Sequence, residues 1–170
     1  MLIWTSTSRP PGLDDSTSAL HFYGSQQDGD RVIGGLQSRA EFEPPPRLTV
    51  ELLLRLQPPT APAEEMIASA VAFQADRPDA GAMGVAAEGV RLVFCLGQSA
   101  PEGVDPAVLE PNRWYYLAAT FEVREGQTTV NGYLADLTEA DAQLVQVAQD
   151  LVFEGTPTPG PLRIGEGFDR

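Results

Sequence analysis

An aromatic-rich stretch at residues 112–134, NRWYYLAATFEVREGQTTVNGYL, constrains the fold more strongly than any other part of the chain. In its first half every second residue is apolar and would share one face of an extended chain: Tyr115, Leu117, Ala119, Phe121 and Val123. A period of two in a segment rich in aromatic and β-branched side chains is typical of a half-buried β-strand. We therefore expect a long strand that begins near Trp114.

The second half of this stretch predicts a hairpin. Residues 124–127 contain Gly126, and glycine readily takes positive φ, so a tight turn is expected there. The strand pattern resumes at residues 128–130. Asn131–Gly132 is a strong turn dipeptide, so we expect a second turn and then a third strand from Tyr133. The stretch thus predicts a compact antiparallel unit.

A second alternating segment lies at residues 48–56. Its apolar face consists of Leu48, Val50, Leu52, Leu54 and Leu56, and its other face is mixed. Shorter strands are expected at residues 19–23, 31–33, 66–73, 84–87 and 90–96, with turns at 25–30 and 77–81 and a long loop at 97–111.

The composition indicates one all-β domain. The chain has 170 residues, and its 16 glycines and 15 prolines leave few long helical patterns. The formal net charge is −13, and all eleven basic residues are arginine. Such a surface repels phosphate backbones, so nucleic-acid binding is not expected. It is compatible with calcium, with neutral sugars, or with solubility alone.

Disulfide and membrane signals are absent from the sequence. Cys95 is the single cysteine and lies in an apolar strand, so we expect a buried, inert thiol. No apolar run reaches the roughly eighteen residues of a membrane span. Residues 1–4 are too short for a signal peptide and lack a basic lead. The compartment stays open: inside the cell, or extracellular if the chain is a module of a longer surface protein.

Four segments, taken in order, resemble the laminin G-like domain of the concanavalin A-like lectin/glucanase superfamily. They are ALHFYG at 19–24, LTVELLLR at 48–55, WYYLAATF at 114–121 followed by VNG at 130–132, and PLRIG at 161–165. The resemblance implies an antiparallel jelly-roll β-sandwich of two sheets. It divides the chain into an arm and loop at 1–18 and the sandwich at 19–170.

Two segments are ambiguous within this resemblance. Residues 138–152 have apolar residues at helical spacing, and Thr138 with Asp141 resembles a capping box, whereas the family has an extended chain there. We favour a strand. The family has a closing strand after PLRIG that we do not expect here, so we expect residues 2–5 or a neighbouring subunit to supply a strand beside the first one.

Enzymatic chemistry finds little support in the residues, and no enzyme activity is expected. Glycosidases of the superfamily place carboxylates on alternate residues of one strand, but Glu139 and Asp141 are followed by Gln143. Glu41 and Glu43 alternate beside three prolines. His21, the single histidine, has no second ligand for zinc and is expected to be a packed strand residue.

We therefore expect a non-catalytic recognition module that binds carbohydrate or a protein partner. Exposed aromatics stack on sugar faces while amides and acids bind hydroxyls. The candidate ligand-binding residues, all in or near turns, are Tyr23, Asp105, Asn131 and Tyr133. Trp114 is assigned to the core. The alternative is a structural or oligomerisation module without a small ligand, as a homo-oligomer or tandem unit.

Calcium is the one candidate cofactor. Asp28 and Asp30 lie in an acidic turn, and relatives have an acidic turn at the matching place. Acidic residues are also common in turns for conformational reasons, so the metal is a hypothesis.

Overall fold

The computed structural model describes residues 2–5, 19–22, 24–27, 30–33, 36–55, 67–73, 83–88, 91–96 and 107–164. Over these residues the protein is all-β, its strand pairs are antiparallel, and it contains no helix. This confirms the all-β, antiparallel part of the fold class expected from the sequence. Within the same residues there is accordingly no helix of a length and hydropathy that would cross a membrane.

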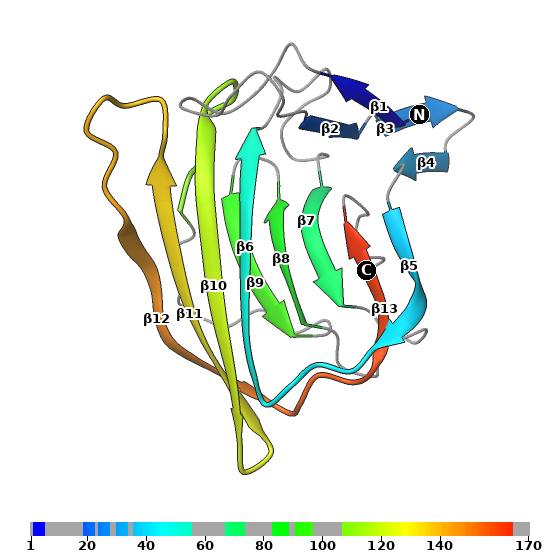
Figure 1. Ribbon diagram of the computed structural model, residues 1–170, viewed down its shortest axis with the longest axis vertical. Helices are drawn as coiled ribbons and strands as arrows, with labels where there is room; N and C mark the ends of the chain where they lie inside the picture. Colours follow the sequence, from blue (N-terminus) through cyan, green and yellow to red (C-terminus); the bar gives the residue numbers. More distant parts are fainter. Residues whose placement is uncertain are drawn as a thin grey trace.

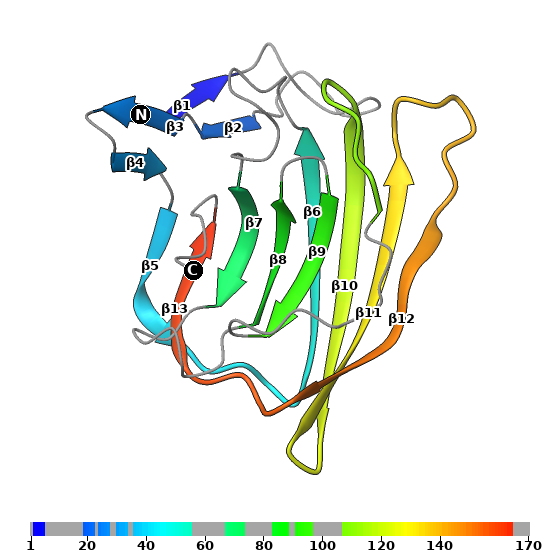
Figure 2. The same ribbon diagram turned by 180° about the vertical axis from the view of Figure 1, so that it is seen from behind.

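Two sheets form the body of the protein (Figures 1 and 2). One has four strands in the order β12-β11-β10-β6. Its strands are β6 (Arg47–Arg55), β10 (Trp114–Arg124), β11 (Gln127–Asp136) and β12 (Val145–Glu154). The other has five, in the order β5-β13-β7-β8-β9. They are β5 (Leu36–Phe42), β7 (Ile67–Phe73), β8 (Met83–Glu88), β9 (Arg91–Leu96) and β13 (Gly160–Ile164).

Two short hairpins precede the sheets and lie together beyond one end of the five-stranded sheet (Figure 1). β1 (Leu2–Thr5) pairs with β2 (Ala19–Phe22), and β3 (Gly24–Gln27) pairs with β4 (Asp30–Ile33). The first pair places residues 2–5 beside the first expected strand, which is one of the two arrangements that we considered. The pair forms a two-stranded sheet of its own.

The core lies between the two sheets. Leu117, Ala119 and Phe121 of β10 are buried together with Leu92, Phe94 and Leu96 of β9. β6 adds its alternate, half-buried apolar residues to this cluster, as the pattern at 48–56 predicts. A smaller cluster of Leu109 and Tyr115 closes one end. The period of two in β10 therefore translates directly into one buried face and one outward face.

The expected turn at Asn131–Gly132 is wrong, because β11 continues through it to Asp136. Gly132 is a glycine for a steric reason instead: a Cβ there would overlap the ring of Phe94 from the opposite sheet. The tight turn at Glu125–Gly126 is confirmed, with φ of 50° and 83°. These paired positive φ values match the two-residue turns that suit the twist of a hairpin.

Three other segments can be compared with the sequence predictions. Residues 25–27, expected in a turn, belong to β3, because they pair with β4. β5 was not anticipated, since its polar sequence lacks a clear alternation. The extended form preferred for residues 138–152 is confirmed for β12, whereas residues 137–144 form turns and irregular chain. Packing against the sheet overrides the local helical spacing.

Trp114 was assigned to the core, and this is wrong. It is half-buried and belongs to neither core cluster. Tyr115 points inward and is 5 % exposed, so alternation places Trp114 on the outward face with Tyr116. The register with β6 agrees, because Trp114 pairs with the exposed Arg55.

Candidate functional site

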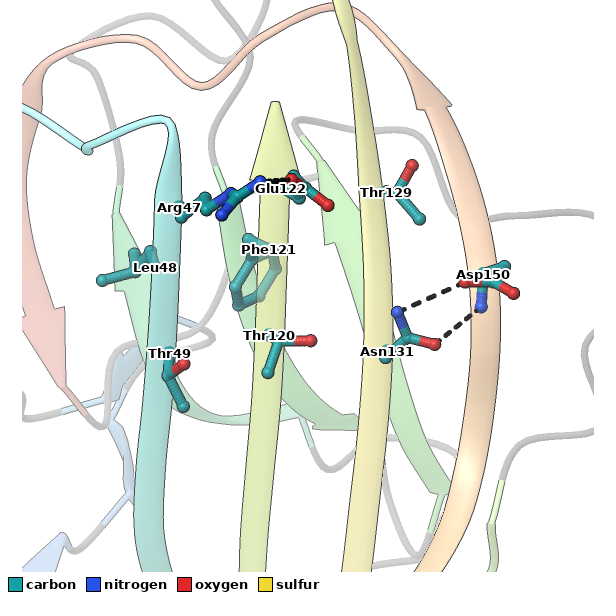
Figure 3. A pocket seen from close by; sticks show the side chains of 9 residues that line it. All are labelled: Arg47, Leu48, Thr49, Thr120, Phe121, Glu122, Thr129, Asn131 and Asp150. Carbon is teal, nitrogen blue, oxygen red and sulfur yellow. Dashed lines mark hydrogen bonds and ion pairs between the residues drawn. The ribbon is translucent and has the colours of Figure 1, made fainter. Parts of the chain in front are cut away.

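The outward face of the four-stranded sheet carries a hollow of about 460 Å³ (Figure 3). All four strands contribute to it, and the residues that line it are Arg47, Leu48, Thr49, Thr120, Phe121, Glu122, Thr129, Asn131 and Asp150. Leu48 and Phe121 belong to the inward face and contribute as its floor. Every other lining residue is polar. The hollow is therefore rich in hydrogen-bond donors and acceptors.

Strand register brings these polar residues into two rows. Thr120 pairs with Thr49 on one side and with Asn131 on the other. One step along the sheet, Glu122 pairs with Arg47 and with Thr129. Directly opposed residues of neighbouring strands have side chains about 5 Å apart on one face. The rows thus form a continuous polar surface across three strands.

Asp150 reaches the hollow through a β-bulge in β12. Gln149 and Asp150 both lie between the pairs Val130–Leu151 and Gly132–Ala148, so two residues of β12 face one residue of β11. Asp150 has a φ of 49°, the left-handed conformation that bulges commonly contain. The extra residue redirects the strand and turns the Asp150 carboxylate toward the neighbouring strand.

Asn131 holds this bulge in place. Its Oδ1 accepts hydrogen bonds from the backbone N–H of Asp150 at 2.9 Å and from Nε2 of Gln146 at 3.1 Å. Its Nδ2 lies 3.5 Å from Oδ1 of Asp150 (Figure 3). Asn131 was predicted as a ligand-binding residue, and the structure does place it at the hollow. Its carbonyl oxygen is thus used by Asp150 and Gln146, and its amide nitrogen points toward the Asp150 carboxylate.

Glu122 is the most strongly coupled charge of the hollow. Arg47 Nη2 lies 2.8 Å from its Oε1, and Arg124 Nη2 lies 2.6 Å from the same oxygen. The hydrogen bond from Arg124 and then that from Arg47 lower the pKa of Glu122. Because both arginines bind Oε1, Oε2 has no ion-pair or hydrogen-bond partner among the described residues. The charged carboxylate therefore retains one acceptor for a ligand.

A strip of aromatic residues adjoins the hollow on the same face. Ala118 pairs with Glu51 and with Tyr133, and the next row pairs Tyr116 with Leu53 and Ala135. The Glu51 carboxylate beside it raises the pKa of Tyr116 as a hydrogen-bond partner. Tyr133 was a predicted ligand-binding residue, and it lies one row away from Asn131. Two of the four predicted residues therefore share one surface.

The other predicted site residues are not brought to this surface by the described structure. Tyr23, Asp105 and Asp28 lie outside the described residues, and Asp30 begins β4 with only its backbone described. Within the described part of the chain, no group of three His, Cys, Asp or Glu residues could hold a metal ion. The calcium hypothesis at Asp28 and Asp30 stays a prediction.

Several residues of the hollow were missed in the sequence. Thr49, Thr120 and Glu122 occupy the phase opposite to the apolar one in two strands that were correctly anticipated. The alternation of apolar and polar residues in these two strands could have identified them as outward-facing. Asp150 had no such signal, because the bulge interrupts the period.

A separate charge cluster lies at the opposite end of β10. Arg113 Nη1 is 2.7 Å from Asp136 Oδ2 and 2.6 Å from Glu139 Oε1, and its Nε is 2.8 Å from Glu110 Oε2. Burial alone would raise the pKa of Asp136, but hydrogen bonds from Thr138 and Arg113 outweigh it and lower that pKa. The cluster ties the segment before β10 to the turn after β11.

In comparisons with known proteins, neither a protein-family model, nor a curated protein, nor a solved structure matches the chain.

Proposed function

We propose that this protein is a non-catalytic recognition module that binds neutral carbohydrate on the outward face of its four-stranded sheet, within a jelly-roll β-sandwich of the laminin G-like kind. The observation that carries the proposal is the hollow lined by threonine hydroxyls, an amide, two carboxylates and a guanidinium. The sandwich assignment is supported by two antiparallel sheets that share one core.

The chemistry of the hollow suits a polyol. A sugar hydroxyl both donates and accepts a hydrogen bond, so it requires both kinds of partner. Thr49, Thr120 and Thr129 offer hydroxyls that do either. Glu122 Oε2 and the Asp150 carboxylate accept, and Arg47 donates. The net charge of −13 disfavours acidic glycans and leaves neutral sugars as the class that best fits.

A protein partner is a weaker candidate for this hollow. The centre of a protein interface is usually apolar and depleted in charged residues. Here the two apolar lining residues, Leu48 and Phe121, turn their side chains toward the core. The exposed residues above them are polar or charged.

The electrostatics favour binding over catalysis. A glycosidase requires one carboxylic acid whose pKa is raised enough to donate a proton. The pKa of Glu122 is shifted the other way by Arg124 and Arg47. A carboxylate that stays ionised is a good hydroxyl acceptor and a poor general acid.

A glycan array tests the proposal, with binding measured once with calcium and once with a chelator. The wild-type chain is expected to bind neutral glycans in both conditions, because the hollow needs no metal. A Thr49→Val/Thr120→Val variant removes two hydroxyls at nearly constant shape and is expected to lose most of the signal. Thr156→Val, at an exposed loop position outside the hollow, is the matched control.

Each other outcome has a clear meaning. Binding only with calcium would support carbohydrate recognition but would place the binding site at acidic residues outside the hollow. No binding to any glycan would reject carbohydrate recognition. It would favour a structural or oligomerisation module, for which the solution mass is the next measurement.

A further inference from the structure

We infer that the bound carbohydrate is an oligosaccharide that runs lengthwise along β10, with Tyr133 and Tyr116 forming an aromatic subsite beyond the polar hollow. The inference rests on the proposed function, since it extends the same surface. It adds a second subsite and a preference for chain length.

The register places the two tyrosines side by side on one face. Tyr133 pairs with Ala118, and Tyr116 pairs with Ala135, on the neighbouring strands β10 and β11. The two aromatic residues are therefore diagonal neighbours, about 7 Å apart between their backbones. Between β10 and β11 each tyrosine has an alanine as its direct partner, whereas on its other side Tyr116 pairs with Leu53 of β6 and Tyr133 with Gln146 of β12.

Burial shows that large side chains lie over these alanines. Ala118 and Ala135 belong to the outward face, yet each is only 7 % exposed. An outward alanine reaches that value only when neighbouring side chains cover it. Tyr116 and Tyr133 are the large side chains at the adjacent positions of the paired strands, and both are themselves half-buried. This arrangement fits rings that lie along the sheet and present an aromatic face outward.

The strip continues the hollow without interruption. Along β10, Thr120 of the hollow is followed on the same face by Ala118 and then by Tyr116. Each step of two residues advances about 7 Å along a strand. Tyr133 therefore lies one step beyond Asn131, and Tyr116 lies roughly 14 Å beyond Thr120. A ligand that spans both parts must be longer than one sugar ring.

The polar hollow and the aromatic subsite differ in chemistry, and together they indicate the class of ligand. The apolar C–H face of a pyranose stacks on an aromatic ring, whereas its equatorial hydroxyls bind polar groups. Glu51, which pairs with Ala118 beside the strip, and Gln146, which pairs with Tyr133, place polar groups on both flanks of the rings. A chain of neutral pyranoses offers both surfaces along its length.

The test is a length series. Gluco-, manno- and xylo-oligosaccharides from disaccharide to hexasaccharide are titrated into the intact chain by calorimetry. We expect affinity to rise with length until both tyrosines are covered. Tyr133→Thr and Tyr116→Thr remove the ring and put a β-branched residue that favours strands in its place, and each is expected to weaken the binding of the longer ligands by roughly fivefold to tenfold. The affinity of the disaccharides should change little.

Two controls keep the result specific. Tyr133→Phe and Tyr116→Phe retain the rings and are expected to retain the dependence on length. Thermal unfolding of each Thr variant reports whether the sheet is intact, and a variant that does not fold is replaced by the corresponding Tyr→Leu.

The outcomes separate the inference from the proposed function. Binding that is equally tight at every length, or Thr variants that bind hexasaccharides like the wild type, would overturn the aromatic subsite and leave the hollow as the site. Failure of every sugar at every length would overturn both.

Discussion

Gly132 of β11 lies directly beneath the ring of Phe94 of β9, and the two residues join the two sheets at the centre of the core. A Cβ at residue 132 would overlap the ring atom Cζ. Phe94 is 4 % exposed and belongs to the main core cluster. The glycine therefore sets how closely the four-stranded sheet, which carries the candidate site, approaches the other sheet.

Gly132→Ala should destabilise the protein strongly. The added methyl group has no space unless Phe94 moves, and overpacking of a core typically costs about 1–3 kcal/mol. Phe94→Leu in the same chain should recover part of that loss, because the smaller side chain vacates the space. A double-mutant cycle measured by urea unfolding should give a favourable coupling of about 1 kcal/mol or more. Additive losses would show that the two residues are not in contact.

Gly126→Ala is the natural contrast to that substitution. A Cβ at Gly126 would meet no atom within 4 Å, but its φ of 83° is unfavourable for alanine. We expect a loss of about 1 kcal/mol from backbone strain alone. Phe94→Leu should leave this loss unchanged. Urea unfolding of Gly126→Ala, with and without Phe94→Leu, checks both statements, and a larger cost than that of Gly132→Ala would contradict them.

We expect Asp150 to affect the stability of the protein through its backbone conformation more than through its charge. At a φ of 49°, alanine is strained whereas glycine is not, so Asp150→Ala should cost about 1 kcal/mol and Asp150→Gly much less. Asp150→Asn is the matched control, because asparagine tolerates the same conformation without the charge. Chemical denaturation of the three variants ranks them. Equal losses in Ala and Gly variants would assign the effect to the carboxylate.

We expect acid pH to lower the stability of the protein, because Asp136 becomes protonated. Its folded pKa lies below the ordinary value, because hydrogen bonds from Thr138 and Arg113 outweigh its partial burial. A lowered pKa contributes stability that is present above the unfolded pKa and is lost as the pH falls through the folded one. The melting temperature should therefore drop below a pH of about 4. Asp136→Asn should be less stable at neutral pH and show a smaller acid dependence.

Glu139→Gln serves as the comparison for that measurement. Glu139 also binds Arg113, but its side chain is 58 % exposed against 22 % for Asp136. Solvent screens exposed ion pairs, so the substitution should change the melting curve little. An acid dependence that disappears in Glu139→Gln and persists in Asp136→Asn would reverse the assignment.

The local sequence pattern was sufficient to predict the strands that have one buried face. The alternation in β10 and β6 predicted which residues point inward, and Gly126 predicted the turn between β10 and β11. The same alternation places Trp114 on the outward face, which contradicts its assignment to the core. Trp114 follows the phase of its strand, and its neighbour Tyr115 already fills the inward position.

Long-range contacts account for what the sequence did not reveal. Asn131–Gly132 has a high local turn propensity, yet Phe94, distant in the chain, requires a residue without a side chain at 132. Likewise, Asp150 enters the hollow only because Asn131 holds a bulge in the neighbouring strand. β5 is a polar strand at the edge of its sheet, and its pairing with β13 cannot be deduced from its own residues. Such features arise from pairs of strands rather than from single ones.

Glu122 gives the candidate site a pH dependence that can be predicted in sign. If its carboxylate accepts a sugar hydroxyl, affinity should hold while Glu122 is ionised and fall once it is protonated. Hydrogen bonds from Arg124 and Arg47 lower its pKa, so the fall should begin below the ordinary glutamate value of about 4.3. Titration of a bound oligosaccharide from neutral to acid pH by calorimetry measures this. Glu122→Gln should bind more weakly at neutral pH and lose the acid transition, while Glu125→Gln, in the exposed turn, should behave like the wild type. A transition that survives in Glu122→Gln would place the titrating group elsewhere on the surface.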